Sequence, residues 1–235
     1  MSISCDLYSQ VTTCEDVHQI AGSFSMIHIQ YFGHSFWKVW NDETAIAIDP
    51  YQEMGYPLPK DVTADVVCSS HDHFDHNNIG LIKGTSLVIR SEGKFTFGKV
   101  EFRTYGTFHD EEHGAKRGKN LLLQFTMEGR TFLHCGDLGD DPSAEIMEQV
   151  MKPDVLFIPV GGFYTIDAAK AHELVNQLQP VLVFPMHYRS KLVDSKIAPV
   201  TDYLSKVVDA VQIDSNILDL TEELFQGNKT ILMQF

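Results

Sequence analysis

The stretch His71-Asp72-His73-Phe74-Asp75-His76 places three imidazoles and two carboxylates within six residues, directly after an apolar run. A solvated turn has no reason to gather so many groups of this kind. Neutral imidazole nitrogen and carboxylate oxygen are the donors that zinc and related divalent metals accept. The spacing H-x-H-x-D-H therefore predicts a metal-binding loop.

Three further ligand-type residues follow apolar, strand-like runs later in the chain: His109, Asp137 and His187. Functional groups are commonly presented at the ends of strands. With the loop, they make a set that fits two neighbouring divalent metals sharing one carboxylate. The candidate metal ligands are His71, His73, Asp75, His76, His109, Asp137 and His187.

In this order, these residues resemble the metallo-β-lactamase superfamily of metal-dependent hydrolases, over about residues 26–190. Four short segments are similar to a small bacterial branch related to ascorbate-phosphate lactonases: Gly33-His34-Ser35, Ile48-Asp49-Pro50, Pro159-Val160-Gly161-Gly162 and Pro185-Met186-His187-Tyr188. The resemblance implies an α+β fold, a four-layer αββα sandwich of two mixed β-sheets flanked by helices. It places the metals at one edge of the sandwich.

The resemblance also implies a role for each ligand. His71, His73 and His109 would hold the first metal, Asp75, His76 and His187 the second, and Asp137 would bridge the two. Zinc is the expected metal, with Mn²⁺ or Fe²⁺ as alternatives. Redox relatives that hold two iron ions have Glu where His73 stands, which favours hydrolysis here.

A binuclear hydrolase is the function that we expect. A divalent metal lowers the pKa of bound water to about 7. The activated water can then attack an ester, lactone or phosphoester bond of a small substrate, either neutral or anionic. Asp75 and Asp137 are the candidate catalytic residues, with Asp75 orienting or deprotonating the water. The alternatives are a phosphodiesterase or nuclease of the same superfamily, and an inactive binding or scaffold protein on this fold.

Composition weighs against some of these functions. The 235 residues carry a formal charge of −14, which disfavours binding to nucleic acid or to an anionic membrane surface. The intact ligand set argues against an inactive scaffold. No apolar run is long enough for a membrane span and no secretory signal is evident, so we expect a cytoplasmic protein. We expect a small-molecule substrate, and the sequence is compatible with a homo-oligomer.

Several residues near the ligands are candidates for supporting roles, each with a plainer alternative. His34 could orient a ligand or be a packed turn histidine, and Asp49 could fix the metal-binding loop by hydrogen bonds or end its strand. His113 could protonate a leaving group, although a solvated histidine is the simpler interpretation. His134 is expected on the outward face of its strand.

The substrate contacts are expected from two further segments. Arg117, in the basic cluster 116–120, could bind an anionic group or lie in a solvated loop balanced by Asp110, Glu111 and Glu112. Tyr164 could line the pocket or belong to a turn. Tyr188 and Arg189 flank His187 and are further candidates for substrate contact.

The pattern along the chain predicts one domain over residues 26–235, preceded by an extension of residues 1–25. Short β-branched and aromatic runs predict an antiparallel meander over 26–48 and further strands up to residue 135. Helices are expected over 142–151, 167–178 and 200–211, with strands at 154–159 and 181–184 between them. Cys68 and Cys135 lie in apolar runs and are expected to be buried free thiols, whereas the sequence does not indicate the state of Cys5 and Cys14.

Overall fold

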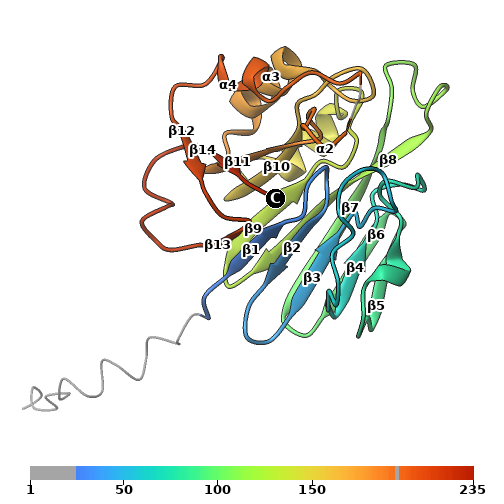
Figure 1. Cartoon of the computed structure of the whole chain (residues 1–235), viewed down its shortest axis with the longest axis vertical. Coiled ribbons are helices and arrows are strands. Elements are labelled where there is room, and N and C mark those ends of the chain that lie inside the picture. The colour runs from blue at the N-terminus through green and yellow to red at the C-terminus, as the bar shows by residue number, and fades with distance from the viewer. Residues whose placement is uncertain (1–24, 194–195) are drawn as a thin grey trace, which may run out of the picture.

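Two mixed β-sheets packed face to face form the body of the protein in a computed structural model that describes residues 25–193 and 196–235 (Figure 1). The expected extension, residues 1–25, lies outside the described residues except for Ser25. The first sheet has the order β13-β1-β2-β3-β4-β5. Its strands are β1 His28–Tyr31, β2 Trp37–Trp40, β3 Ala45–Ile48, β4 Val66–Cys68, β5 Leu87–Ile89 and β13 Ile217–Asp219.

The predicted meander is confirmed in this first sheet. Strands β1, β2 and β3 pair antiparallel, and β3, β4 and β5 then pair parallel. Because β3 and β4 are parallel, their carboxyl ends meet at the same edge of the sheet. The segments that follow these ends begin with Asp49 and with the loop that contains His71.

The second sheet has the order β12-β14-β11-β10-β9-β8-β7-β6 and is antiparallel from β6 to β9, then parallel. The two-residue turn Glu128-Gly129 joins β8 to β9. Its strands are β6 Gly93–Phe97, β7 Val100–Phe108, β8 Lys119–Met127, β9 Arg130–His134, β10 Val155–Pro159, β11 Leu182–Met186, β12 Ala210–Ile213 and β14 Lys229–Met233.

The main core lies between the two sheets. Alternation along β3 sends Ile46 and Ile48 into this core, where Trp37 packs its ring 4.7 Å from that of Phe157 in the opposite sheet. Ala47 points to the other face of the first sheet and joins a second, smaller apolar cluster. Loops and the 3₁₀ turn η1 (Ile79–Leu81) cover that face.

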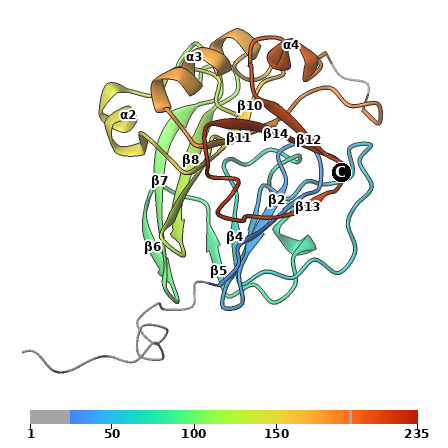
Figure 2. The same ribbon diagram turned by 90° about the vertical axis from the view of Figure 1, so that its left-hand side faces the viewer.

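Three α-helices cover the outer face of the second sheet: α2 Ala144–Val150, α3 Ala168–Leu178 and α4 Thr201–Leu204 (Figure 2). Helix α3 begins where the sequence predicts, because the Asp167 carboxylate accepts a hydrogen bond from the backbone N–H of Lys170. The predicted α+β sandwich of two mixed β-sheets is confirmed. In the described part of the chain, the layer outside the first sheet consists of loops and η1 rather than α-helices.

The prediction of a helix over residues 200–211 is wrong beyond its first turn. Helix α4 ends at Leu204, and residues 210–213 form β12 at the edge of the second sheet, paired in parallel with β14. The apolar spacing of this segment fits a helix, but the β-branched Val207, Val208 and Val211 favour extended backbone, and β14 supplies a strand to pair with. Strands β13 and β14 lie beyond the elements that the sequence predicts.

Two further expectations concern the whole chain. Cys68 and Cys135 are buried free thiols, as predicted, and Cys5 and Cys14 lie outside the described residues. Within residues 25–193 and 196–235, no helix is long and apolar enough to cross a membrane.

Candidate metal centre

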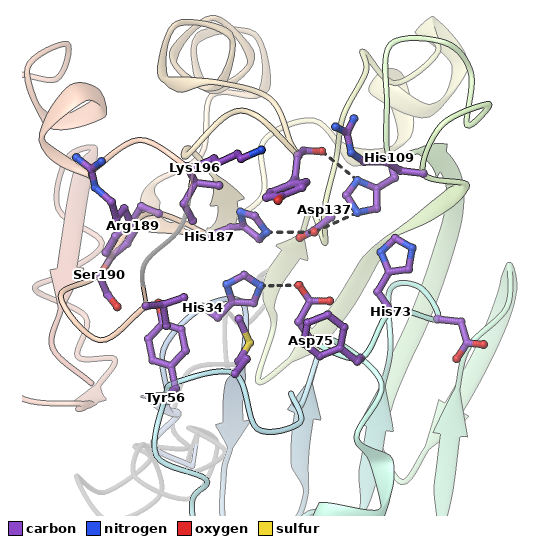
Figure 3. A pocket seen from close by; sticks show the side chains of 18 residues that line it. His34, Tyr56, His73, Asp75, His109, Asp137, His187, Arg189, Ser190 and Lys196 are labelled. Carbon is purple, nitrogen blue, oxygen red and sulfur yellow. Dashed lines mark hydrogen bonds and ion pairs between the residues drawn. The ribbon is translucent and has the colours of Figure 1, made fainter.

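The predicted ligands meet where the loops after β4, β7, β9 and β11 come together. His71 to His76 follow β4, His109 follows β7, and Asp137 and His187 follow β9 and β11. Figure 3 shows His73, Asp75, His109, Asp137 and His187 turned toward a common space. Residues far apart in the sequence thus form one cluster.

Asp49 anchors the loop that carries most of the cluster. It is fully buried just after β3, and its carboxylate accepts hydrogen bonds from the backbone N–H of Ser70 (2.7 Å), the Ser70 hydroxyl (2.7 Å) and His76 Nδ1 (2.9 Å). A histidine that donates one ring N–H to a carboxylate presents its other nitrogen in a fixed direction. Asp49 therefore aims His76 Nε2 into the cluster.

A first group consists of His71, His73 and His109, whose potential ligand atoms all lie within 4.8 Å of one another. The side chains of His71 and His109 are buried in this group, whereas that of His73 is exposed. The Nδ1 atom of His109 donates to the carbonyl oxygen of Tyr164 (3.1 Å), which leaves Nε2 to face the cluster. This group offers three nitrogen donors to one ion.

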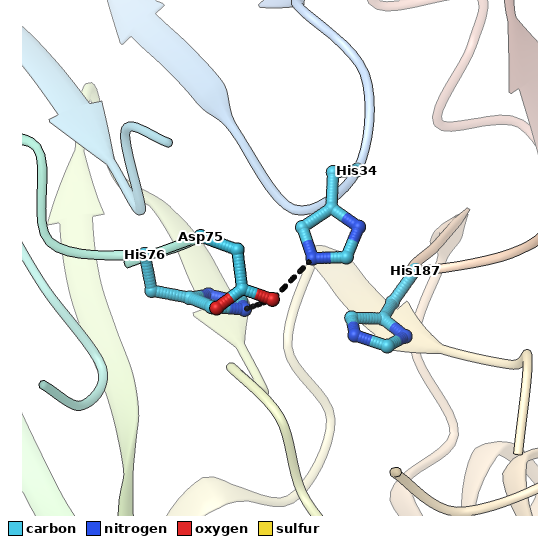
Figure 4. Close-up of side chains that lie close together, drawn as sticks. All are labelled: His34, Asp75, His76 and His187. Atoms are coloured by element: carbon cyan, nitrogen blue, oxygen red, sulfur yellow. Dashed lines mark hydrogen bonds and ion pairs between the residues drawn. The ribbon is translucent and has the colours of Figure 1, made fainter. Parts of the chain in front are cut away.

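A second group consists of His34, Asp75, His76 and His187, again with potential ligand atoms within 4.8 Å of one another (Figure 4). His34 comes from the turn after β1, and its Nε2 lies 3.2 Å from Asp75 Oδ2. The sequence suggests His34 only as a supporting residue, so its place within this group is new.

Asp137 lies between the two groups. Its carboxylate oxygens are 3.2 Å from the Nε2 atoms of His76, His109 and His187, and 4.0 Å from that of His71. Asn120 holds the Asp137 loop by accepting a hydrogen bond from the backbone N–H of Asp137 (2.9 Å). A carboxylate shared by both groups is the arrangement expected of a bridging ligand.

The glycine before Asp137 is required by close packing. Gly136 has φ +53°, and an added Cβ would lie 2.3 Å from Asn120 Oδ1 and 2.5 Å from Ser70 Cβ. Only glycine fits there. Asn120 is buried and also donates to the carbonyl of Cys135 (2.9 Å), a role that sequence reasoning missed because it placed Asn120 in a basic loop.

Unpartnered polar atoms test whether the cluster fits a metal. His71 Nε2, His76 Nε2 and Asp137 Oδ1 are buried and have no hydrogen-bond partner among the described residues. His76 Nε2 and Asp137 Oδ1 are 3.2 Å apart without forming an aligned hydrogen bond. A buried polar group left unsatisfied costs about 1–3 kcal/mol, and a divalent ion would satisfy all three. The nitrogen and oxygen donors present here fit such an ion.

The electrostatics of the cluster keep two of its imidazoles, His71 and His34, in the neutral form that binds metal. Burial, with repulsion from His76, lowers the pKa of His71 to about 3. Burial and the neighbouring His187 lower the pKa of His34 to about 4. Both side chains are therefore neutral at pH 7, with a lone pair available to a metal.

The carboxylates of the cluster are ionised. Burial opposes the charge of Asp137, but His187 and His76 outweigh it and hold the pKa of Asp137 well below its ordinary value. Burial likewise disfavours the imidazolium of His76, yet Asp137, Asp49 and Asp75 raise its pKa. The centre is thus a region of negative potential that favours a cation at the position of His76 Nε2.

A cavity of about 820 Å³ opens onto the cluster. Most of the predicted supporting residues line this cavity. His113 does not line it, and its side chain is 79% exposed and lies 3.5 Å from Asp140. Asp49 lies behind the ligands. The predicted supporting residues that line the cavity are His34, Arg117, Tyr164, Tyr188 and Arg189.

The prediction that His134 lies on the outward face of its strand is wrong. His134 is fully buried, its Nε2 contacts the carbonyl of Ser35 (3.2 Å), and its Nδ1 accepts from the backbone N–H of Gly136 (3.1 Å). Alternation along β9 sends this side chain toward the first sheet, where it supports the turn before Asp137.

The fold and the cluster together define a metallo-β-lactamase-type hydrolase. The sequence profile of the β-lactamase superfamily domain matches residues 28–187, and the chain belongs to this superfamily. It is 34% identical to a Thermotoga maritima protein whose crystal structure is described as a candidate Zn-dependent hydrolase of the metallo-β-lactamase superfamily. That match covers 88% of this chain and 98% of the other, with a TM-score of 0.75.

Curated relatives carry the same general description. A UPF0173 metal-dependent hydrolase of Desulforamulus reducens is 26% identical over 192 residues, covering 69% of this chain and 84% of the relative. A protein of the same description from Thermoplasma volcanium is 26% identical over 191 residues, covering 70% and 84%. The chain is thus a metal-dependent hydrolase with a His/Asp cluster able to bind metal.

Proposed function

We propose that this protein is a binuclear hydrolase for a small substrate that combines an anionic group with an apolar portion. The observation that carries the proposal is the arrangement of two donor groups around Asp137, open to one cavity. His71, His73 and His109 would hold one divalent ion, and Asp75, His76 and His187 the other, with zinc as the first candidate. The ions would supply a water of lowered pKa and polarise the scissile bond of an ester, lactone or phosphoester.

Asp75 is placed to handle the proton of the attacking water. Burial opposes its charge, but His76 and His34 outweigh this effect and keep the pKa of Asp75 below its ordinary value. Its carboxylate therefore remains an acceptor at neutral pH, on the wall of the cavity. An acceptor at this position can orient a water hydrogen and withdraw it as the nucleophile forms.

The charge of the cavity wall favours an anionic substrate. Arg117, Arg189 and Lys196 line the cavity, and none of them forms an ion pair with a residue that the structure describes. The wall carboxylate of Asp72, in contrast, is paired with Arg90 at 2.6 Å. In a chain of net charge −14, three cations at one cavity that have no ion-pair partner among the described residues are a specific feature.

Arg117 is held in place without being neutralised. Asp110, which the sequence suggests as a balancing charge, accepts backbone N–H groups instead, including that of Arg117 at 2.6 Å. The Arg117 guanidinium lies 5.4 Å from the ring centre of Tyr164. The planar group is thus free to pair with a carboxylate or phosphate.

The other part of the wall is apolar. The cavity volume lies within the ~300–1,000 Å³ typical of sites for drug-sized ligands. We infer that the substrate has an apolar body as well as a charged group. The apolar and aromatic residues of the wall are Met54, Tyr56, Phe74, Tyr164, Tyr188, Val193 and Ile197.

Hydrolysis by the metal-loaded protein is the direct test. We expect activity toward anionic esters, lactones or phosphoesters in a screen that also contains phosphodiesters, thioesters and β-lactams. His73→Ala removes one of three donors of the first group and serves as the blank. Activity that survives His73→Ala, or elemental analysis that finds no metal even after reconstitution, would contradict the proposal.

Arg117→Gln tests the anionic part of the substrate. A hydrogen bond to a charged group contributes about 1.5–3 kcal/mol, so we expect KM for an anionic substrate to rise at least about 10-fold, with little change for its neutral ester or amide analogue. Lys116→Gln is the matched control, because the neighbouring Lys116 pairs with Glu112 at 2.6 Å and is not part of this cavity. Equal, small changes for both substrates would reject the role of Arg117.

A further inference from the structure

We propose that His34 is a fourth protein ligand of the second metal position, so that the two positions of the centre are not equivalent. The second position would be filled by His34, Asp75, His76 and His187, and the open position for water and substrate would lie at the three-histidine group. This inference rests on the metal centre of the proposed function and adds a residue outside the ligand set that the resemblance implies.

The side chain of His34 lies among the donors of the second group. Its ring centre is 4.3 Å from that of His187 and 5.2 Å from that of His76. Its Nε2 is 3.2 Å from Asp75 Oδ2, and Figure 4 shows the four side chains facing one another. A separation of 3.2 Å also joins Asp137 to His109 and to His187, which are both proposed ligands. His34 therefore has the spacing of a member of the centre.

The backbone shows that this placement is enforced. His34 has φ +54°, in the left-handed region that residues with a Cβ rarely adopt. Its carbonyl oxygen accepts hydrogen bonds from the backbone N–H of His187 (3.0 Å) and the hydroxyl of Tyr31 (3.0 Å). Strained conformations of this kind persist only where the surroundings impose them. The turn after β1 is thus fastened to the residue at the end of β11 that the centre already contains.

A hydrogen bond from His34 to Asp75 is the competing explanation for the same geometry. In that arrangement Nε2 carries a hydrogen and only positions the carboxylate, and the nitrogen is not available to a metal. The 3.2 Å distance fits both arrangements. Glutamine separates them, because its amide can still donate to Asp75 but is a poor ligand for zinc.

Different donor numbers give the two positions different character. Catalytic zinc sites keep a coordination position for water and can expand to five-coordinate, so of two positions the one with fewer protein donors is the more open. With the shared Asp137 counted, the second position has five donors and the first has four, one of which is His73 on the cavity wall. We therefore infer that the second ion is the more tightly held.

Metal counting on the full-length protein tests the inference without measuring activity. Wild type, His34→Ala, His34→Gln and the control His113→Ala are stripped with a chelator, reloaded with Zn²⁺ or Co²⁺, and passed through gel filtration before elemental analysis. Wild type and His113→Ala should retain two ions per chain. Both His34 variants should retain one, with the affinity of the lost ion reduced by more than the ~10–100-fold typical of residues that only support a ligand. The visible spectrum of the Co²⁺ form should lose the bands of one site.

Two results would overturn the inference. If His34→Gln retains two ions at wild-type affinity, His34 only positions Asp75, and if His34→Ala does so, His34 has no role toward the metal. Circular dichroism of the metal-free variants checks that they fold. A wild-type protein that retains a single ion would contradict the binuclear proposal. In that case, His34 is a metal ligand only if His34→Ala loses that ion.

Discussion

Asp137→Asn is expected to lower the metal affinity of both positions together and to reduce kcat by more than about 100-fold. A loss of about 100-fold is the upper end of the effect found for residues that only support a metal ligand. Asp137 is the carboxylate that lies within 3.2 Å of histidines from both groups, His109 in the first and His76 and His187 in the second. Asparagine keeps the size of the side chain but removes its negative charge. The four nearby imidazoles would then lose the charge that draws a cation to them.

Elemental analysis after gel filtration, alongside kcat for any substrate found in the screen, measures this effect. The pattern across variants is the sharpest result, because His73→Ala should empty the first position alone and His34→Ala the second alone. Asp140→Asn is the matched control, since Asp140 lies three residues further along the same loop and contacts the exposed His113. An Asp137→Asn protein that loses one ion and keeps the other at wild-type affinity would show that Asp137 does not bridge.

The clustering of the candidate metal ligands could be predicted from the sequence because each of these residues has a local signal. His71, His73, Asp75 and His76 form one motif, and His109, Asp137 and His187 each follow a strand-like apolar run. The structure brings all seven into one cluster with His34. Such local patterns also predict the cluster, because the ends of neighbouring strands meet at the edge of a sheet and bring these residues together.

Residues that act through tertiary packing could not be predicted in the same way. Asn120 supports the Asp137 loop only because β7, β8 and β9 pair in a particular register, and nothing near it in the sequence reports that register. His34 joins the second group because the turn after β1 is hydrogen-bonded to the end of β11.

The fold shows the same division. The helix over 168–178 has a capping residue and an apolar face that predict it correctly, whereas residues 210–213 form a strand because β14 offers a partner. A pattern of apolar residues limits which elements can form, but pairing between distant segments decides among them.

Asp49→Ala is expected to lower the free energy of unfolding by about 3–5 kcal/mol, the range for removing one partner of a buried charged pair. The Ser70 N–H and His76 Nδ1 would be left without an acceptor in a fully buried space. Alanine would also have to adopt the φ of +52° found at Asp49. Asp49→Asn tolerates that backbone better and should cost about 1–3 kcal/mol, while weakening metal binding about 10–100-fold because His76 is no longer aimed by a carboxylate.

The pH dependence of this effect follows from the charge of Asp49. Burial raises the pKa of the carboxyl, but His76, followed by His134 and His71, outweighs burial, so the folded-state pKa lies below the ordinary value. A carboxyl with a lowered pKa stabilises the fold fully above its unfolded pKa of about 3.9, and this contribution is lost as the pH falls toward the folded value. Urea unfolding of metal-free wild type and Asp49→Asn should therefore give a difference in the free energy of unfolding at pH 7 that shrinks below about pH 4.

Asp65→Asn is the control, since Asp65 also accepts a backbone N–H (Ala45, 2.8 Å) but lies at the other end of the strands. A difference for Asp49→Asn that is no larger than that of Asp65→Asn, or that grows on acidification, would show that the ionised Asp49 does not hold the metal-binding loop.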